Sequence, residues 1–479
     1  MRKDSTLFST RSPARSTRSV RSITSGRFPW SSGILGALPR WLLLVLLFPL
    51  IVSVLSGCGI GFSGTPGAYT PGSPESSPPG SGGTDGSSGS SKSTGSIEGY
   101  VYAGRTSRSM TVSRLAVAPE GHDPVSGARV LVEGTSVSAG TDSSGYFRID
   151  NVAPGIWTLI ISHPDYRDPV KTQVRVEAGH VTPIGPVQLG IGYYLFIGID
   201  DYMDPRVNDL TGCVADATAM RDALMTPGSF VGQGGLLTNS AASKAGIRQA
   251  IEGIGQRMNR EDFFVLYYSG HGARALDGSK EVICPYDSSP LSWGSDITDG
   301  ELADWLRGLP SQKITVILDS CYSGAFINGN VTRAARSGVP AAAGAPAATR
   351  VKGVRGAVLD AGATGKMGKA ALMGGVLAMK ALRNSGYTVL TASSQDELSY
   401  EVNGHGVFTS ALVKALGTDR RRADTSQDGI ITARELFDYA ASETKRATMG
   451  WNSANPGGPA QTPQLELWPG NNPPVLRYR

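Results

Sequence analysis

Cysteine is scarce in this sequence, with only four residues in 479. Their spacing matches no zinc site, and at most one disulfide, between Cys213 and Cys284, is conceivable in an exported protein. These two cysteines stand in separate apolar contexts, where unpaired core residues are more common. Cysteine therefore indicates no metal centre, and it leaves Cys58 and Cys321 for other roles.

A basic surface that would indicate nucleic-acid binding is also missing. The net charge is +5, but much of it belongs to an arginine-rich leader at the start of the chain. After that leader, no stripe of Lys and Arg is interleaved with aromatic residues, which make up only 7% of the chain. We therefore expect no nucleic-acid partner.

Long apolar runs are absent except for one, at residues 41–55. Many arginines and a single acid, Asp4, precede it, as in a signal sequence. The sequence L-S-G-C at residues 55–58 resembles the bacterial lipobox, whose cysteine is acylated. We expect residues 1–58 to be the signal, and the protein to be exported and anchored to the bacterial cell envelope through a lipid on Cys58. The alternatives are a single membrane anchor and a transit peptide. A transit peptide would need an amphipathic segment, whereas this run is apolar all round.

Two regions of different composition follow the leader. Residues 59–95 are almost all Gly, Ser, Pro and Thr, which predicts a flexible linker. Residues 96–189 contain short alternating apolar and polar runs separated by turn residues, which predicts an antiparallel β-sandwich. Its order of G-x-V, P-V-x-G-A-x-V and T-D-x-x-G-x-F resembles the carboxypeptidase regulatory-like domain, which implies no catalytic residue.

Residues 191–445 alternate strand and helix patterns, which is typical of an α/β fold with helices on both faces of a sheet. Strands are expected at 193–200, 235–238, 263–269, 281–284, 314–319 and 388–392. Helices are expected near 213–225, 244–257, 299–306, 407–416 and 433–444. Thr298 with Glu301, and Thr432 with Glu435, have the spacing of capping boxes. Residues 446–479 form a C-terminal segment.

Two of these predicted strands end next to reactive side chains. The run at 263–269 is followed by Gly270-His271-Gly272, and the run at 314–319 by Ser320-Cys321. Ligand chemistry in parallel sheets gathers at the carboxyl ends of strands, so we expect His271 and Cys321 to lie close together. A thiol beside an imidazole can give up its proton and attack a carbonyl carbon. The pattern predicts a cysteine peptidase, although either residue alone is more often packed core.

The sequences Y-S-G-H-G at 268–272 and D-S-C-Y-S-G at 319–324 resemble the catalytic signatures of caspase-like peptidases, in particular the bacterial metacaspases. The resemblance implies a caspase-like, mostly parallel sheet flanked by helices, and a cysteine-type endopeptidase. Cys321 would be the nucleophile and His271 the general base and acid. The backbone N–H groups of Gly272 and Cys321 would hold the oxyanion. No residue that orients the imidazole can be identified from spacing, and the family's catalytic group is usually described as a Cys-His dyad. The chemistry requires no cofactor.

The resemblance also implies which substrates are cut, because metacaspases cleave after Arg or Lys whereas caspases cleave after Asp. Asp216 follows Cys213 by three residues, as in the metacaspase acidic pocket. Asp319 lies two residues before Cys321, so strand alternation puts both side chains on one face. Two carboxylates attract a guanidinium, and we expect protein or peptide substrates with Arg or Lys before the scissile bond. The alternative for Asp216 is an acid that stabilises a helix N-terminus.

Calcium is a candidate cofactor because metacaspases of the activated type bind it through aspartates near the active site. The nearest acids here are Asp287, Asp296 and Asp299, but Asp299-Gly300 replaces the paired acids of the family. A second run resembles an EF-hand loop, with candidate ligands Asp424, Ser426, Asp428 and Glu435. The alternative for this run is a loop that caps a helix.

Residues 328–386 interrupt the α/β pattern with a segment rich in Ala, Gly, Arg and Lys, which predicts a flexible insertion. Residues 370–383 within it have the pattern of a short helix. We expect the enzyme to cut itself in this segment, after one of five basic residues. These are Arg333, Arg336, Arg350, Lys352 and Arg355. The alternative is an insertion with no regulatory role.

A non-enzymatic reading competes with the peptidase. Caspase folds that have lost His or Cys exist, and a catalytically silent scaffold or adhesion protein at the cell envelope is the alternative function. This chain retains both His271 and Cys321, which favours the enzyme.

Overall fold

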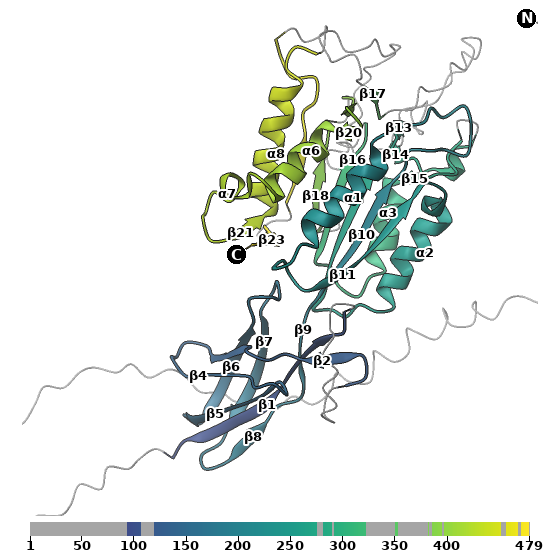
Figure 1. Ribbon diagram of the computed structural model, residues 1–479. Coiled ribbons are helices and arrows are strands. Elements are labelled where there is room, and N and C mark those ends of the chain that lie inside the picture. The colour runs from purple at the N-terminus through teal and green to yellow at the C-terminus, as the bar shows by residue number, and fades with distance from the viewer. Residues whose placement is uncertain are drawn as a thin grey trace, which may run out of the picture. The chain divides into compact units, whose positions relative to one another are not determined.

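The computed structural model describes residues 93–106, 119–274, 281–289, 292–321, 350–352, 382, 386–394, 397–451, 457–467 and 471–478. The leader with Cys58 and nearly all of the linker lie outside these residues, as does the predicted helix at 370–383 except for its residue 382. Within the described ranges, no helix is long and apolar enough to cross a membrane. Two folded regions are described, one all-β and one α/β (Figure 1).

The all-β region consists of two small sheets, which confirms the predicted sandwich. The first contains β1 (Gly95–Gly104), β2 (His122–Pro124), β5 (Tyr146–Val152), β8 (Val181–Pro183) and β9 (Val187–Leu189). The second contains β4 (Ser138–Gly140), β3 (Arg129–Val132), β6 (Gly155–Ser162) and β7 (Val170–Val176), in that order. The prediction of purely antiparallel pairing is wrong for β1, which pairs in parallel with β8 and β9. The chain leaves this sheet for β6 and β7 and comes back to it at β8, where it runs in the same direction as β1.

The α/β region is built on a six-stranded sheet in which only the last strand is antiparallel. Its order is β11 (Gly232–Thr238), β10 (Gly192–Gly198), β12 (Phe263–Ser269), β16 (Ile314–Asp319), β18 (Thr388–Thr391) and β22 (Gln464–Glu466). Every residue of β10, β12 and β16 is buried, as expected for parallel strands covered on both faces. Strands β12 and β16 have the predicted bounds, because their apolar runs stop sharply at Gly and Ser.

Helices cover both faces of this sheet, as predicted. They are α1 (Cys213–Leu224), α2 (Lys244–Gly255), α3 (Asp299–Arg307), α6 (Val407–Leu416), α7 (Arg420–Ala423) and α8 (Ala433–Ala447), with short 3₁₀ turns η2 (Asn239–Ala242) and η3 (Trp293–Ser295). Alternate residues along β10 join different cores: Leu195 packs in the cluster with α2 and α3, and Phe196 in the cluster with α1, α6 and α8. Both predicted capping boxes are formed, at Thr298 and at Thr432.

Three small sheets complete the region. They are β13 (Gly272–Arg274) with β14 (Glu281–Ile283) and β15 (Ile297–Thr298), β17 (Arg350–Val351) with β19 (Tyr400–Val402) and β20 (His405–Gly406), and β21 (Ile430–Thr432) with β23 (Pro474–Arg477). The strand expected at 281–284 therefore exists, but it belongs to the first of these sheets and not to the main one.

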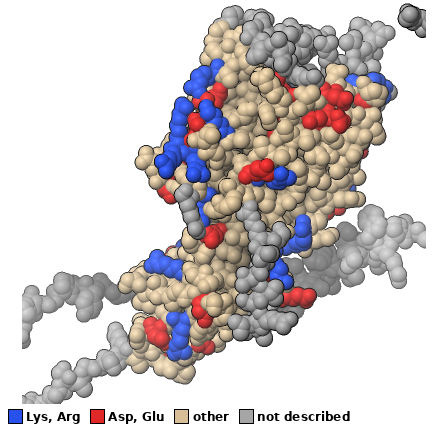
Figure 2. Space-filling model, in the orientation of Figure 1, with Lys and Arg blue, Asp and Glu red and all other residues tan. Residues whose placement is uncertain are grey.

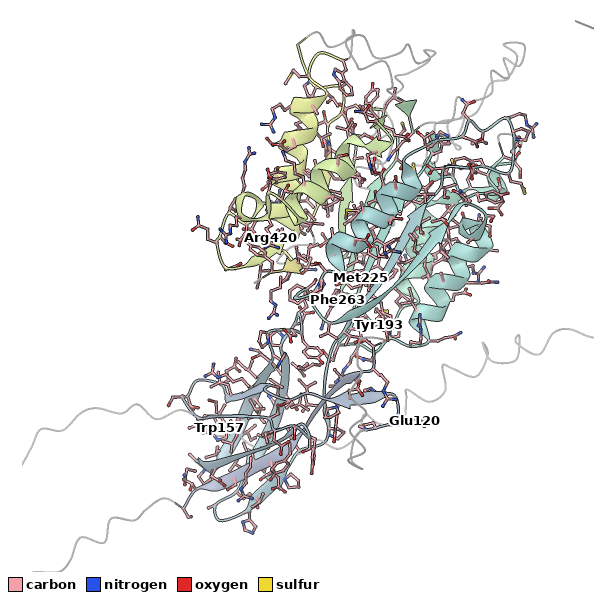
Figure 3. The ribbon with its side chains drawn as sticks, viewed as in Figure 1. Glu120, Trp157, Tyr193, Met225, Phe263 and Arg420 are labelled. Atoms are coloured by element: carbon pink, nitrogen blue, oxygen red, sulfur yellow. The ribbon has the colours of Figure 1, made fainter. Side chains whose placement is uncertain are left out.

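The two ends of the main sheet have different roles. Tyr193 and Phe263, near the amino ends of β10 and β12, are labelled at the lower end of this region in Figure 3. The short strands β13, β17 and β20 are labelled at the opposite end in Figure 1, close to the label of β16. Strand β12 is parallel to β16 and ends beside it, with Ser269 opposite Asp319. The residues that follow the central strands are thus gathered at one edge of the sheet.

Basic side chains gather on the surface over α7 and α8 (Figure 2). Two acidic residues lie among them. Lys414 and Arg422 are each within ion-pair distance of both Asp419 and Glu443. This surface is therefore a network of ion pairs between neighbouring helices.

Candidate active site

The structure brings His271 and Cys321 to the same edge of the sheet. Strands β12 and β16 are parallel neighbours in which Ser269 lies opposite Asp319. His271 and Cys321 each follow two residues later, and each is only 1% exposed. The shared register explains why two residues fifty positions apart reach the same edge of the sheet.

The imidazole of His271 is oriented by a backbone group. Its Nε2 lies 2.6 Å from the carbonyl oxygen of Asn208, which can only accept a hydrogen bond, so Nε2 carries the proton. The other nitrogen, Nδ1, is buried and has no hydrogen-bond partner among the described residues. Burial lowers the pKa of His271 to about 4, so the ring is neutral at pH 7 and Nδ1 can accept a proton. The group that orients the ring in the described part of the chain is a backbone carbonyl, which is why sequence reasoning could not identify it.

The side chain of Cys321 is buried against the backbone of Ser399. Its Sγ accepts a hydrogen bond from the backbone N–H of Ser399 at 3.1 Å. Burial nevertheless raises the pKa of Cys321 far above its ordinary value. A thiolate therefore forms here only if a nearby base takes the proton. The other two described cysteines, Cys213 and Cys284, are also free and buried, so they form no disulfide.

Two backbone N–H groups converge on one carbonyl oxygen beside Cys321. Gly272 and Cys321 donate to the oxygen of Lys352 at 3.1 and 3.2 Å. A β-carbon on Gly272 would lie 2.2 Å from the Cys321 oxygen, so only glycine fits at this position. Fixed N–H donors of this kind can stabilise the negative oxygen that develops when a carbonyl is attacked.

The side chain of the same lysine fills an acidic pocket. The Nζ of Lys352 lies 2.9 Å from Asp216 Oδ2, 3.0 Å from Asp319 Oδ2 and 2.8 Å from Ser269 Oγ. All four residues are 0% exposed. Burial by itself would lower the pKa of Lys352, but the two carboxylates raise it well above its ordinary value. The lysine is therefore a cation enclosed by two predicted pocket residues.

The pocket carboxylates are themselves fixed by surrounding donors. Asp319 accepts hydrogen bonds from the hydroxyls of Ser399 and Thr409, each at 2.6 Å. Asp216 accepts from the backbone N–H of Gly406 at 2.9 Å. A β-carbon on Gly406 would lie 2.1 Å from Asp319 Oδ2 and 2.4 Å from the lysine Nζ, so glycine forms one wall of the pocket. These supporting residues carried no assigned role in the sequence analysis.

The chain leading to Lys352 is bound as an extra strand. Arg350 and Val351 form β17, which pairs antiparallel with β19 so that Arg350 lies opposite Glu401 and Val351 opposite Tyr400. The backbone N–H of Lys352 then donates to the Ser399 oxygen at 3.0 Å. Strand addition of this kind is a general way to hold an extended peptide.

Two of the first group of candidate calcium ligands contact Lys244, one of them through its backbone oxygen. The Nζ of Lys244 donates to the backbone oxygens of Gly294 and Asp296 and to the Glu301 carboxylate, at 2.7–3.0 Å. Burial raises the pKa of Asp296 to about 6, and Asp287 accepts from the backbone N–H of Lys244 at 2.8 Å. Asp299 is a buried first residue of α3. The three candidate carboxylates are not gathered into a group that could hold a metal ion in the described part of the chain, so they do not fit calcium.

The second group of candidate ligands forms a helix-capping loop. Asp424 accepts from the backbone N–H groups of Gln427 and Gly429 at 2.7 and 2.9 Å, and from the hydroxyl of Ser426. Glu435 binds the N-cap Thr432 and the backbone N–H of Ser426, and Asp428 accepts from the N–H of Ile430. Protein donors take these oxygens, so the loop does not fit calcium either. No group of three or more His, Cys, Asp or Glu in the described part of the chain is placed to hold a metal ion.

Comparison with known proteins matches this arrangement to a family. The caspase domain matches residues 191–467, and the carboxypeptidase regulatory-like domain matches residues 116–189. Metacaspase-1B from Aspergillus oryzae is 31% identical over 149 residues, which are 28% of this chain and 35% of the relative. Metacaspase-6 from Arabidopsis thaliana is 32% identical over 149 residues, which are 28% of this chain and 38% of the relative.

The aligned part of the chain spans little more than a third of the length of these two relatives. Among solved structures, caspase-1 from Spodoptera frugiperda is 13% identical with a TM-score of 0.34, and the alignment covers 58% of this chain and 87% of the other. The caspase-domain match alone covers more than half of the chain. The protein therefore belongs to the caspase-domain family of cysteine peptidases.

Proposed function

We propose that the protein is a cysteine endopeptidase that hydrolyses peptide bonds after Lys or Arg. The observation that carries this proposal is the position of Lys352, whose ammonium lies between Asp216 and Asp319 while its carbonyl oxygen accepts the N–H groups of Gly272 and Cys321. One basic residue thus occupies both the specificity pocket and the oxyanion site. That is the arrangement of a residue on the acyl side of a scissile bond.

The catalytic steps use His271 and Cys321. Nδ1 of His271 takes the proton of the Cys321 thiol, and the sulfur attacks the carbonyl carbon of the substrate. The N–H groups of Gly272 and Cys321 hold the oxyanion, and the imidazolium then gives its proton to the leaving amine. Water, deprotonated by the same imidazole, hydrolyses the acyl-enzyme and restores the thiol. Both starting groups are neutral, so the proton moves as the sulfur attacks.

The pocket selects a cation for electrostatic reasons. Asp216 and Asp319 are fully buried, and an acidic side chain bound there would place a third carboxylate beside them. An uncharged side chain would leave both carboxylates without their counter-ion. Lys or Arg alone supplies the missing charge.

The same geometry supports a proposal of self-processing. Of the five basic residues expected as cleavage points, Lys352 has its side chain in the pocket, and Arg350 lies two residues earlier in β17. The other three lie outside the described residues. We infer that the bond between Lys352 and Gly353 is a substrate of the enzyme, and that the uncut chain blocks its own pocket.

The cellular setting is a further part of the proposal. We infer that Cys58 carries a lipid and holds the exported protein at the bacterial cell envelope, on the strength of the lipobox at residues 55–58. Incorporation of a tagged fatty acid, lost in Cys58→Ala, would support this. Equal labelling of both proteins would contradict it.

Peptide cleavage tests the central proposal. The full chain should release the fluorophore from peptides ending in Lys or Arg but not from one ending in Asp, and Cys321→Ala should release none. Equal signals from the wild type and Cys321→Ala would refute the peptidase and favour the silent scaffold. Cleavage after Asp would refute the basic specificity alone.

A further inference from the structure

A histidine lies at the mouth of the acidic pocket. His405 belongs to β20 and its side chain is 48% exposed, whereas Asp216 beneath it is fully buried. Its Nδ1 lies 3.1 Å from Asp216 Oδ1, while the other oxygen of the same carboxylate, Oδ2, lies 2.9 Å from Lys352 Nζ. One carboxylate is therefore shared between an imidazole on the solvent side and a bound cation inside.

This sharing places a protein donor on the oxygen of each acid that the lysine does not contact. Oδ1 of Asp216 is taken by His405 and by the N–H of Gly406, and Oδ1 of Asp319 accepts the hydroxyl of Ser399. An ammonium needs only one oxygen from each acid, and the lysine uses one from each. A guanidinium instead binds best when it contacts both oxygens of one carboxylate.

The charged groups around His405 come from three elements. They are Asp216 of α1, Lys352 after β17 and Glu401 of β19. The hydrogen bond to Asp216 raises the pKa of His405 above its ordinary value, while burial and the lysine charge oppose that rise. When His405 is protonated, two cations compete for the same carboxylate.

We propose that His405 is a specificity-determining residue of the basic pocket, which favours Lys over Arg and weakens the binding of both when it is protonated. This inference rests on the proposed peptidase function. Binding is reciprocal. If a bound cation lowers the affinity of His405 for a proton, protonation of His405 lowers the affinity of the pocket for that cation by the same factor. Below the pKa of His405 the pocket carries one more positive charge, so KM for basic peptides should fall as the pH rises through that pKa.

Two substitutions separate the hydrogen bond from the charge. Asn places an amide N–H where His has Nδ1, so His405→Asn should keep the preference for Lys but lose the pH dependence of KM. His405→Ala should lose both, and the ratio of kcat/KM for Lys over Arg peptides should fall about tenfold, since a charged hydrogen bond is at stake. An unchanged Lys to Arg ratio in His405→Ala would overturn the specificity role. Unchanged pH dependence in both variants would overturn the electrostatic role.

A second measurement does not need catalysis. The chain has only five histidines, so the His405 resonance can be assigned by comparison with His405→Asn in an NMR titration. In full-length Cys321→Ala, the pKa of His405 should rise when Lys352 is also replaced by Met, because the competing cation is gone. An identical pKa with and without Lys352→Met would overturn the coupling. Failure to cleave any peptide would refute the proposed function, and this titration would still decide the inference.

Discussion

Two groups of buried acids in this domain are used in opposite ways. In the loop between α7 and α8 and in the first turn of α8, the oxygens of Asp424 and Glu435 accept hydrogen bonds from nearby backbone and hydroxyl donors. In the pocket, Asp216 and Asp319 face an ammonium that is 136 residues from the first of them in sequence. Both groups suggested cation binding from sequence, and the partners of the oxygens distinguish them.

The difference shows what marks a buried acid as functional. A carboxylate whose neighbours in the chain supply its donors stabilises the local fold, as a capping box does. A pair of carboxylates on two separate elements, fixed by other side chains and open to a cation, costs desolvation free energy that a bound partner must offset. The second arrangement is the one expected where a substrate binds.

Removing the nucleophile or the base should have the largest effect and leave both acid groups intact. Cys321→Ala and His271→Ala should each lower kcat by about 10,000-fold or more, since the two groups act as one unit. The double variant should be no worse than either single one. Steady-state kinetics, with circular dichroism to verify folding, would measure this. A double variant far slower than both single variants would contradict the assignment.

Neutralising one carboxylate of the pocket should have the second largest effect on kinetics, and the same change in the loop should have none. Asp216→Asn or Asp319→Asn should raise KM for Lys peptides about 30-fold, because a lost charge-assisted hydrogen bond costs about 2 kcal/mol. Asp424→Asn is the matched control in the loop.

The control should lower the thermal midpoint without changing KM. A comparable rise in KM for Asp424→Asn would mean that the loop also binds substrate. Unchanged KM in both pocket variants would remove the basis for selecting a cation.

The smallest effect should come from the capping box of α8. Thr432→Ala removes the hydroxyl that accepts from the Glu435 N–H, and it should lower the free energy of unfolding by about 1 kcal/mol. Denaturant titration would measure this loss, with exposed Asp438 replaced by Asn as a control expected to change little. A change in kcat/KM would contradict a purely structural role.

Much of the framework could be predicted because its signals are local. The apolar runs of β12 and β16 end at Gly and Ser, and the capping boxes need only a three-residue spacing. Asp319 could be placed near Cys321 because strand residues two apart face the same side. Short-range periodicity thus carried the central sheet and the positions of the reactive side chains.

The missing parts depend on contacts between distant residues. Lys352 lies in a segment of low complexity with several basic residues, so the sequence does not distinguish one candidate cleavage point from another. The fold shows that its side chain reaches Asp216. The carbonyl of Asn208 orients His271 through a main-chain atom, which no residue type reveals. His405 carries no sequence signal of its own, because its contact with Asp216 is fixed by the turn between β19 and β20.

Sequencing the products of self-cleavage tests the central claim most directly. The purified full chain should yield a new fragment that begins at Gly353, and that fragment should be absent from Cys321→Ala and from Lys352→Gln. Arg350→Gln is the matched control two residues away and should still be cut at the same bond. A wild-type chain that remains intact while fully active on peptides, or one cut equally well in Lys352→Gln, would contradict the account.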